Sequence, residues 1–132
     1  MTQAHFPQAP DQHTLEHGLE LSPRFDAAGL IPAITVHADT GEVLMLGYMN
    51  AEALRLTIDT GEVHYFSRSR NELWHKGATS GQIQHVRELR VDCDQDAILL
   101  KVHPGGDGGA CHTGARNCFY RVLEDGRLVE RP

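Results

Sequence analysis

The chain has 132 residues, of which 40% are hydrophobic and 23% are charged, an ordinary balance for a single globular domain. Its formal charge of −6 with neutral histidines argues against a general binder of nucleic acids or anionic membranes. The sequence lacks both a long apolar run for a membrane span and, at its N-terminal end, the apolar stretch of a secretory signal. Its three cysteines cannot all pair, so we expect reduced thiols and a cytoplasmic protein.

The first half of the chain predicts a hairpin followed by a helix. Residues 1–22 are polar and proline-containing, which indicates a flexible leader before a single domain over 23–132. Two mostly apolar segments, 30–36 and 42–48, flank the turn sequence Asp39-Thr40-Gly41, so they predict a β-hairpin. A helix is predicted over 51–60, between the N-cap residue Asn50 and the terminating Gly61, with these residues facing inward: Ala51, Leu54 and Ile58.

The second half predicts mostly strands. They are expected over residues 62–67, 83–94, 97–102, 118–123 and 127–130, with a loop over 68–81 and a glycine-rich connection over 103–114. Many strands and few helices predict a mainly β (α+β) fold. We expect a small twisted or barrel-like sheet with one or two helices.

Three carboxylates alternate with other residues near the middle of the chain, at Asp92, Asp94 and Asp96, and Cys93 lies between the first two. If the strand 83–94 continues through them, the acids share one face and the thiol lies on the other. Acids two apart on a strand are about 6–7 Å from one another and repel, which a hard divalent cation would relieve. The alternative is a solvated acidic turn.

The three thiols suggest a second kind of site. Cys93, Cys111 and Cys118 lack the paired spacing of structural zinc sites, and three ligands leave a fourth position for water, as in catalytic zinc. His112 adjoins one thiol, where it can move a proton. The plain alternative is that these are buried free cysteines. If Cys93 faces away from the acids, its partner thiols come from the same chain or from a second copy.

A basic loop over 68–81 offers groups that bind a nucleotide. Its cations and hydroxyl groups suit phosphate, its glycines Gly77 and Gly81 let backbone amides approach an anion, and its indole can stack on a base. It has neither a Walker nor a GxGxxG spacing, so an ordinary solvated loop is the alternative. The side chains that we expect to bind substrate are Arg68, Arg70, Trp74, Lys76, Thr79 and Ser80.

Several strings occur in the order found in one protein family. They include GLIPAI at 29–34, SRSR at 67–70, LWHKGATSG at 73–81, DCDQDA at 92–97 and ACHTG at 110–114. From about residue 24 to 121 the chain resembles phosphoribosyl-AMP cyclohydrolase, the enzyme of histidine biosynthesis, in its monofunctional form.

The resemblance implies a reaction, two metals and an assembly. The reaction is hydrolysis of the N1–C6 bond in the adenine ring of 1-(5-phosphoribosyl)-AMP by zinc-activated water, with magnesium assisting and His112 as the catalytic residue. Zinc would bind Cys93, Cys111 and Cys118, shared between the two chains of an intertwined homodimer. Magnesium would bind the three carboxylates Asp92, Asp94 and Asp96.

The sequence departs from the family pattern at Val36-His37, in the glycine-rich stretch 103–109 and at Asn117. Two other functions stay open at this point. One is a zinc-dependent, deaminase-like hydrolase of another purine nucleotide. The other is a non-catalytic metal-binding module, which would need a fourth protein ligand such as His112.

Overall fold

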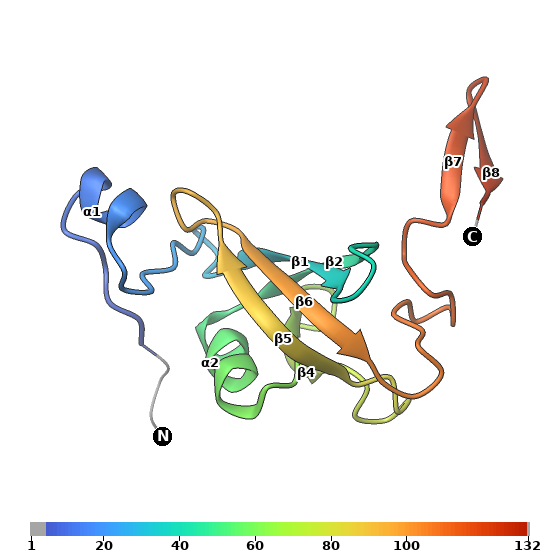
Figure 1. Ribbon diagram of the computed structural model, residues 1–132, viewed down its shortest axis with the longest axis horizontal. Coiled ribbons are helices and arrows are strands. Elements are labelled where there is room, and N and C mark those ends of the chain that lie inside the picture. The colour runs from blue at the N-terminus through green and yellow to red at the C-terminus, as the bar shows by residue number, and fades with distance from the viewer. Residues whose placement is uncertain (1–4, 132) are drawn as a thin grey trace.

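The computed structural model describes residues 5–131 and confirms the mainly β fold, with two helices and three separate twisted sheets (Figure 1). The barrel-like expectation is wrong, because the largest sheet has the order β2-β1-β6-β5 and does not close on itself. The elements in chain order are α1 (Gln12–His17), β1 (Ile31–His37), β2 (Val43–Met49), α2 (Ala51–Thr60), β3 (His64–Ser67), β4 (Glu72–His75), β5 (Gln84–Val91), β6 (Ile98–Pro104), β7 (Arg121–Glu124) and β8 (Arg127–Glu130).

Two hairpins joined side by side form the four-stranded sheet. The predicted hairpin is present as the antiparallel pair β1–β2, and β5–β6 forms the second. They join through β1 and β6, which run parallel, with Ile34 opposite Leu99. The apolar side chains of one sheet face form the core together with α2 and β3. The core residues are Ile31, Ala33, Leu44, Met45, Met49, Ala53, Leu54, Val63, Tyr65, Ile98, Leu100, Val102 and Ala110.

Helix α2 has the predicted bounds. The Asn50 side chain accepts a hydrogen bond from Ala53 N at 2.8 Å, and Gly61 ends the helix in the left-handed conformation. The predicted inner face is partly wrong: Ile58 is exposed, and the helix instead buries Ala53, Leu54 and Thr57. Neither helix of the described chain has the length and apolar character needed to cross a membrane.

Strand β4 lies inside the segment predicted to be a loop. It pairs antiparallel with β3, so that Trp74 lies opposite Tyr65. Asn71 adopts a left-handed conformation, with φ of 53°, at the turn between the two strands. The basic segment 68–81 therefore consists of the hairpin turn, β4 and the loop that follows it, and pairing with β3 fixes the place of Trp74.

The C-terminal hairpin β7–β8 projects from the rest of the molecule (Figure 1). Within the described residues, these two strands pair only with each other. Leu123 is 69% exposed and Leu128 is 58% exposed. An isolated two-stranded hairpin is marginally stable in water, and this arm carries large apolar side chains that the rest of residues 5–131 leaves exposed.

Candidate functional site

The acidic segment is a turn and not part of a strand, so the predicted extent of the strand over 83–94 is wrong. β5 ends at Val91, and Asp92 then accepts hydrogen bonds through Oδ1 from the backbone N–H groups of Asp96 (2.9 Å) and Ala97 (3.2 Å). Gln95 is in the left-handed conformation with φ of 57°. The three acids and Cys93 therefore do not lie on opposite faces of a strand, because the backbone reverses direction at this turn.

The same turn gathers the carboxylates more closely than a strand would. One oxygen from each of Asp92, Asp94 and Asp96 lies within 4.8 Å of the other two. Hydrogen bonding to Asp92 and then to Asp94, together with their negative charge, raises the pKa of Asp96 to about 6. Burial alone would raise the pKa of Asp92, but hydrogen bonds from Asp96 and Ala97 outweigh it and lower that pKa. Three crowded carboxylates fit a hard divalent cation with oxygen ligands.

Two of the three thiols lie together. Cys111 is buried, and its thiol lies close enough to that of Cys118 for each to shift the pKa of the other. Cys118 is held against β2, where its backbone N–H donates to Leu44 O at 2.7 Å. Burial opposes ionisation of Cys111 and alone would raise its pKa. Hydrogen bonding by Thr113, the effect of the neighbouring Cys118 thiol and the positive charge of Lys76 together outweigh burial and lower that pKa. Desolvation and the neighbouring Cys111 raise the pKa of Cys118 to about 11. The two thiols of this pair therefore differ, with the pKa of Cys111 lowered and that of Cys118 raised.

The third thiol lies elsewhere in the same chain. Cys93 is exposed in the acidic turn before β6, whereas Cys111 follows the far end of that strand. A strand of seven residues rises roughly 20 Å. Among residues 5–131, the carboxylate trio is the sole group of three metal-ligating side chains brought this close together. One chain therefore presents two soft ligands at one place and the third at another.

Lys76 lies beside the thiol pair. Its side chain is buried, with the residue 3% exposed, and its ammonium is 5.4 Å from the centre of the Trp74 ring. Burial lowers the pKa of Lys76, and the negative potential of Cys118 and Cys111 partly offsets this. Lys76 thus faces the thiols from the floor of the site.

The structure brings the predicted substrate-binding residues and His112 together around two adjoining cavities. The first, about 570 Å³, is lined by the loop after β4 and by the thiol loop, including Lys76, Thr79, Ser80, Cys111 and His112. The second, about 790 Å³, is lined by β2 and β3 and by the start of the basic segment, including Arg68. Arg70, Trp74 and His112 line both. The two cavities therefore adjoin, and His112 belongs to the lining that they share; we refer to the two together as the groove.

Sequence reasoning missed Tyr48, which also lines this groove. The guanidinium carbon of Arg68 lies 3.9 Å from the centre of the Tyr48 ring, a cation–π contact that orients the arginine. Strand alternation offered a signal. Because Met49 is fully buried, its neighbour on the strand points to the opposite face.

The two glycines of the basic segment have structural tasks. Gly81 donates its backbone N–H to Gly77 O at 2.8 Å, so this amide closes a turn. Gly77 has φ of 86°, and a Cβ placed on it would lie 2.1 Å from Ile83 N. The close approach of two backbone segments, rather than of an anion, explains glycine at position 77.

Two of the departures from the family pattern take part in hydrogen bonds next to the thiol loop. Asn117 donates through Nδ2 to Glu42 Oε2 at 2.6 Å and accepts from Phe119 N at 2.8 Å, which holds the chain on both sides of Cys118. In the glycine-rich stretch, His103 Nε2 lies 2.9 Å from Asp39 Oδ1. Asn117 therefore anchors the chain around Cys118, and His103 joins the end of β6 to the turn between β1 and β2.

Comparison with known proteins identifies a family. Residues 45–120 match the family profile described as phosphoribosyl-AMP cyclohydrolase. A protein of that name from Caulobacter vibrioides (strain NA1000 / CB15N) is 71% identical over 126 residues, which is 96% of this chain and 91% of that protein. A protein of the same name from Caulobacter sp. (strain K31) is 68% identical and covers 96% of this chain and 94% of its own length. Another from Brucella canis is 61% identical and covers 94% of this chain and 91% of its own length.

A mainly β fold with a polar, aromatic-lined groove beside a thiol pair is the framework of a small-molecule enzyme. The chain belongs to the phosphoribosyl-AMP cyclohydrolase family. The prediction of a hydrolase of histidine biosynthesis is thereby confirmed at the level of the family. Both rival interpretations, a deaminase-like hydrolase and a non-catalytic module, lose their support.

Proposed function

We propose that this chain hydrolyses the N1–C6 bond in the adenine ring of 1-(5-phosphoribosyl)-AMP. Water forms a bond to C6, the C6–N1 bond breaks, and N1 takes up a proton, so that C6 becomes the carbon of a carboxamide. The observation that carries the proposal is the groove in which His112 meets Trp74 and the basic side chains. Reduced thiols are part of the site, so we place the reaction in the cytoplasm.

The residues of the groove have separable tasks. Trp74 stacks on the purine. Arg68 and Arg70 on one side, with Thr79 and Ser80 on the other, bind the two phosphates at the ends of the substrate. His112, in the lining that the two cavities share, moves a proton between water and the ring nitrogen.

Two metals complete the proposal. Magnesium suits the oxygen ligands of the Asp92, Asp94 and Asp96 turn. Zinc suits the soft ligands Cys93, Cys111 and Cys118, and such an ion supplies hydroxide near neutral pH by lowering the pKa of a coordinated water to about 7. The neighbouring thiols of Cys111 and Cys118, the first with a lowered pKa, support this assignment.

A homodimer accounts for the separated thiols and for the exposed arm. In a twofold-symmetric dimer, Cys93 of one chain lies next to the thiol pair of the other. The apolar side chains of β7–β8 then pack against the partner chain. Two features support this: within one chain β6 lies between Cys93 and Cys111, and the arm has large apolar side chains that are exposed.

The direct test is to incubate the purified protein with phosphoribosyl-AMP and follow the ultraviolet change of ring opening. We expect turnover that a chelator abolishes and zinc restores, without release of ammonia. Cys111→Ser should lose both zinc and turnover. Ammonia release would indicate deamination instead, and full turnover in a zinc-free variant would overturn the zinc assignment.

Shared ligands are tested by mixing two inactive proteins, Cys93→Ser and Cys111→Ser. In a mixed dimer, one of the two sites has all three thiols. Because half of the randomly exchanged dimers are mixed and half of their sites are intact, about one quarter of wild-type activity should return. No recovery after verified exchange would show that each site is built from one chain.

A further inference from the structure

Gln95 lies within the acidic turn but faces away from its carboxylates. The residue is 3% exposed. Its Oε1 accepts a hydrogen bond from Ser22 N at 2.7 Å, and its Nε2 donates to Leu15 O at 3.0 Å and to Glu20 O at 3.4 Å. All three partners are backbone groups of the N-terminal segment, so one side chain ties that segment to the turn.

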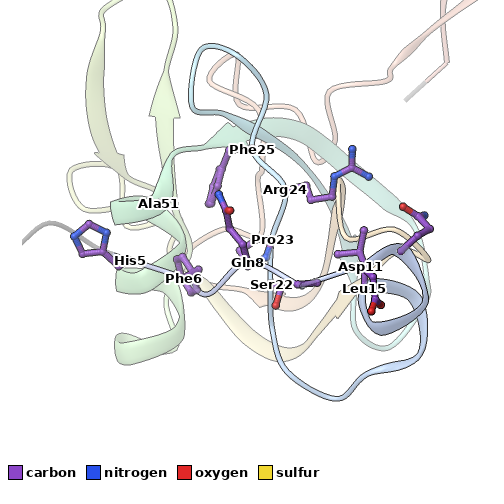
Figure 2. Close-up of a pocket in the computed structure, with 12 residues that line it drawn as sticks. His5, Phe6, Gln8, Asp11, Leu15, Ser22, Pro23, Arg24, Phe25 and Ala51 are labelled. Atoms are coloured by element: carbon purple, nitrogen blue, oxygen red, sulfur yellow. The ribbon is translucent and has the colours of Figure 1, made fainter.

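The backbone adds to this tie. Gln95 O accepts from Arg24 N at 2.7 Å, and the Arg24 guanidinium lies 3.9 Å from Asp94 Oδ2. Figure 2 shows Leu15, Ser22 and Arg24 along one stretch of the N-terminal segment, where they line a cavity of about 560 Å³ against α2. None of the predicted site residues lines that cavity. The N-terminal segment therefore meets the site through the acidic turn and Gln95.

The conformation of Gln95 explains why this tie matters to the carboxylates. Its φ of 57° is unfavourable for a residue with a Cβ. This left-handed residue stands between Asp94 and Asp96 and takes part in the reversal that brings Asp96 N back to Asp92 Oδ1, at 2.9 Å. Its buried side-chain amide donates two hydrogen bonds and accepts one, and these hold the conformation in which the carboxylates converge.

We propose that Gln95 is a positioning residue for the magnesium ligands, and that it is itself held by its hydrogen bonds to residues 15–24. The inference rests on the proposed magnesium site. Gln95 touches neither metal nor substrate, and it acts by holding Asp94 and Asp96 in place, as partners outside the ligand set commonly do.

The test is Gln95→Gly in the full chain. Glycine accepts the left-handed backbone, so the substitution removes the three side-chain hydrogen bonds while leaving the turn conformation accessible. Titration with Mn²⁺, followed by electron paramagnetic resonance, should show binding about 10- to 100-fold weaker than in the wild type. Amide hydrogen exchange over 92–97 should become faster. Gln8→Gly, an exposed position in the same segment, is the matched control and should bind Mn²⁺ like the wild type.

Each result bears on a different claim. Equal Mn²⁺ affinity in Gln95→Gly and wild type would overturn the inference while leaving the magnesium site intact. A wild type that does not bind Mn²⁺ would overturn the magnesium assignment itself, and unchanged exchange over 92–97 would show that Gln95 does not hold the turn. Ser22→Pro removes the N–H donor from the other side and should weaken Mn²⁺ binding in the same direction, so loss of folding in one variant does not prevent the test.

Discussion

Gly77 and Gly81 share a left-handed backbone, with φ of 86° and 81°, but differ in their surroundings. A Cβ at Gly77 would overlap the backbone of Gln82 and Ile83, whereas a Cβ at Gly81 would meet nothing within 4 Å. We expect Gly77→Ala to lower the free energy of unfolding by roughly 3 kcal/mol, from overlap and strain together. Gly81→Ala should cost about 1–2 kcal/mol, from strain alone. Urea denaturation measures both, and equal losses would show that the close approach at Gly77 contributes nothing.

Tyr48 provides a second prediction about a single residue. Its ring lies under the Arg68 guanidinium at 3.9 Å, and an exposed contact of this kind contributes about 0.5–1 kcal/mol. Tyr48→Leu should therefore raise KM for the nucleotide roughly 2- to 5-fold without changing kcat, since only ground-state orientation is lost. Tyr48→Phe keeps the ring and should keep KM near the wild-type value. If the two variants raise KM equally, the phenolic hydroxyl is what matters and not the contact with Arg68.

The β3–β4 hairpin adds a pH dependence to stability through His64. The ring is stacked on His75 with centroids 4.3 Å apart, and its Nδ1 lies 2.8 Å from Glu62 O. Burial lowers the pKa of His64, with a contribution from His75, and the hydrogen bond to Glu62 offsets this in part. The unfolded chain therefore takes up this proton at a higher pH than the folded one, so stability falls as the pH drops through about 6.5.

We expect the unfolding free energy of His64→Gln to fall less than that of the wild type between about pH 7 and pH 5. Asp96, whose pKa is raised to about 6, acts with the opposite sign and is present in both proteins, so the comparison isolates His64. The matched control is His85→Gln, which removes an exposed ring from β5. Identical pH dependence in all three proteins would mean that protonation of His64 does not affect stability.

Local sequence signals predicted some elements well. Asn50 and Gly61 mark the ends of α2, and both act through their own backbone or side chain. β4 was hidden because its residues are mostly polar and its pairing depends on β3 across the turn at Asn71. The sequence predicts a strand that runs into the acidic turn because apolar residues flank it, and glutamine gives no sign of a left-handed backbone.

Long-range contacts were the least predictable feature of the molecule. The residue types of the site, from Arg68 to His112, could be read from the sequence together with a family resemblance. That they share one groove depends on the hairpin β3–β4 and the thiol loop lying side by side, which no local pattern encodes. The hydrogen bonds of Gln95 with the N-terminal segment could not be predicted from the sequence either, because each joins this side chain to a backbone group distant in the chain.

At the scale of the whole molecule, the arm β7–β8 leads to the last prediction. If its apolar side chains are covered in a homodimer, removing one large contact should weaken association by about 1.5–3 kcal/mol, or roughly 10- to 100-fold in the dimer dissociation constant. Leu123→Glu should therefore shift sedimentation toward the monomer at low protein concentration. Leu19→Glu introduces the same charge at a leucine that is 104% exposed on the N-terminal segment, and it should leave the dimer intact. A wild-type chain that sediments as a monomer would contradict both the covered arm and the shared zinc site that we propose, because sharing ligands needs two chains. If the two variants sediment alike as dimers, the arm β7–β8 does not lie in the interface.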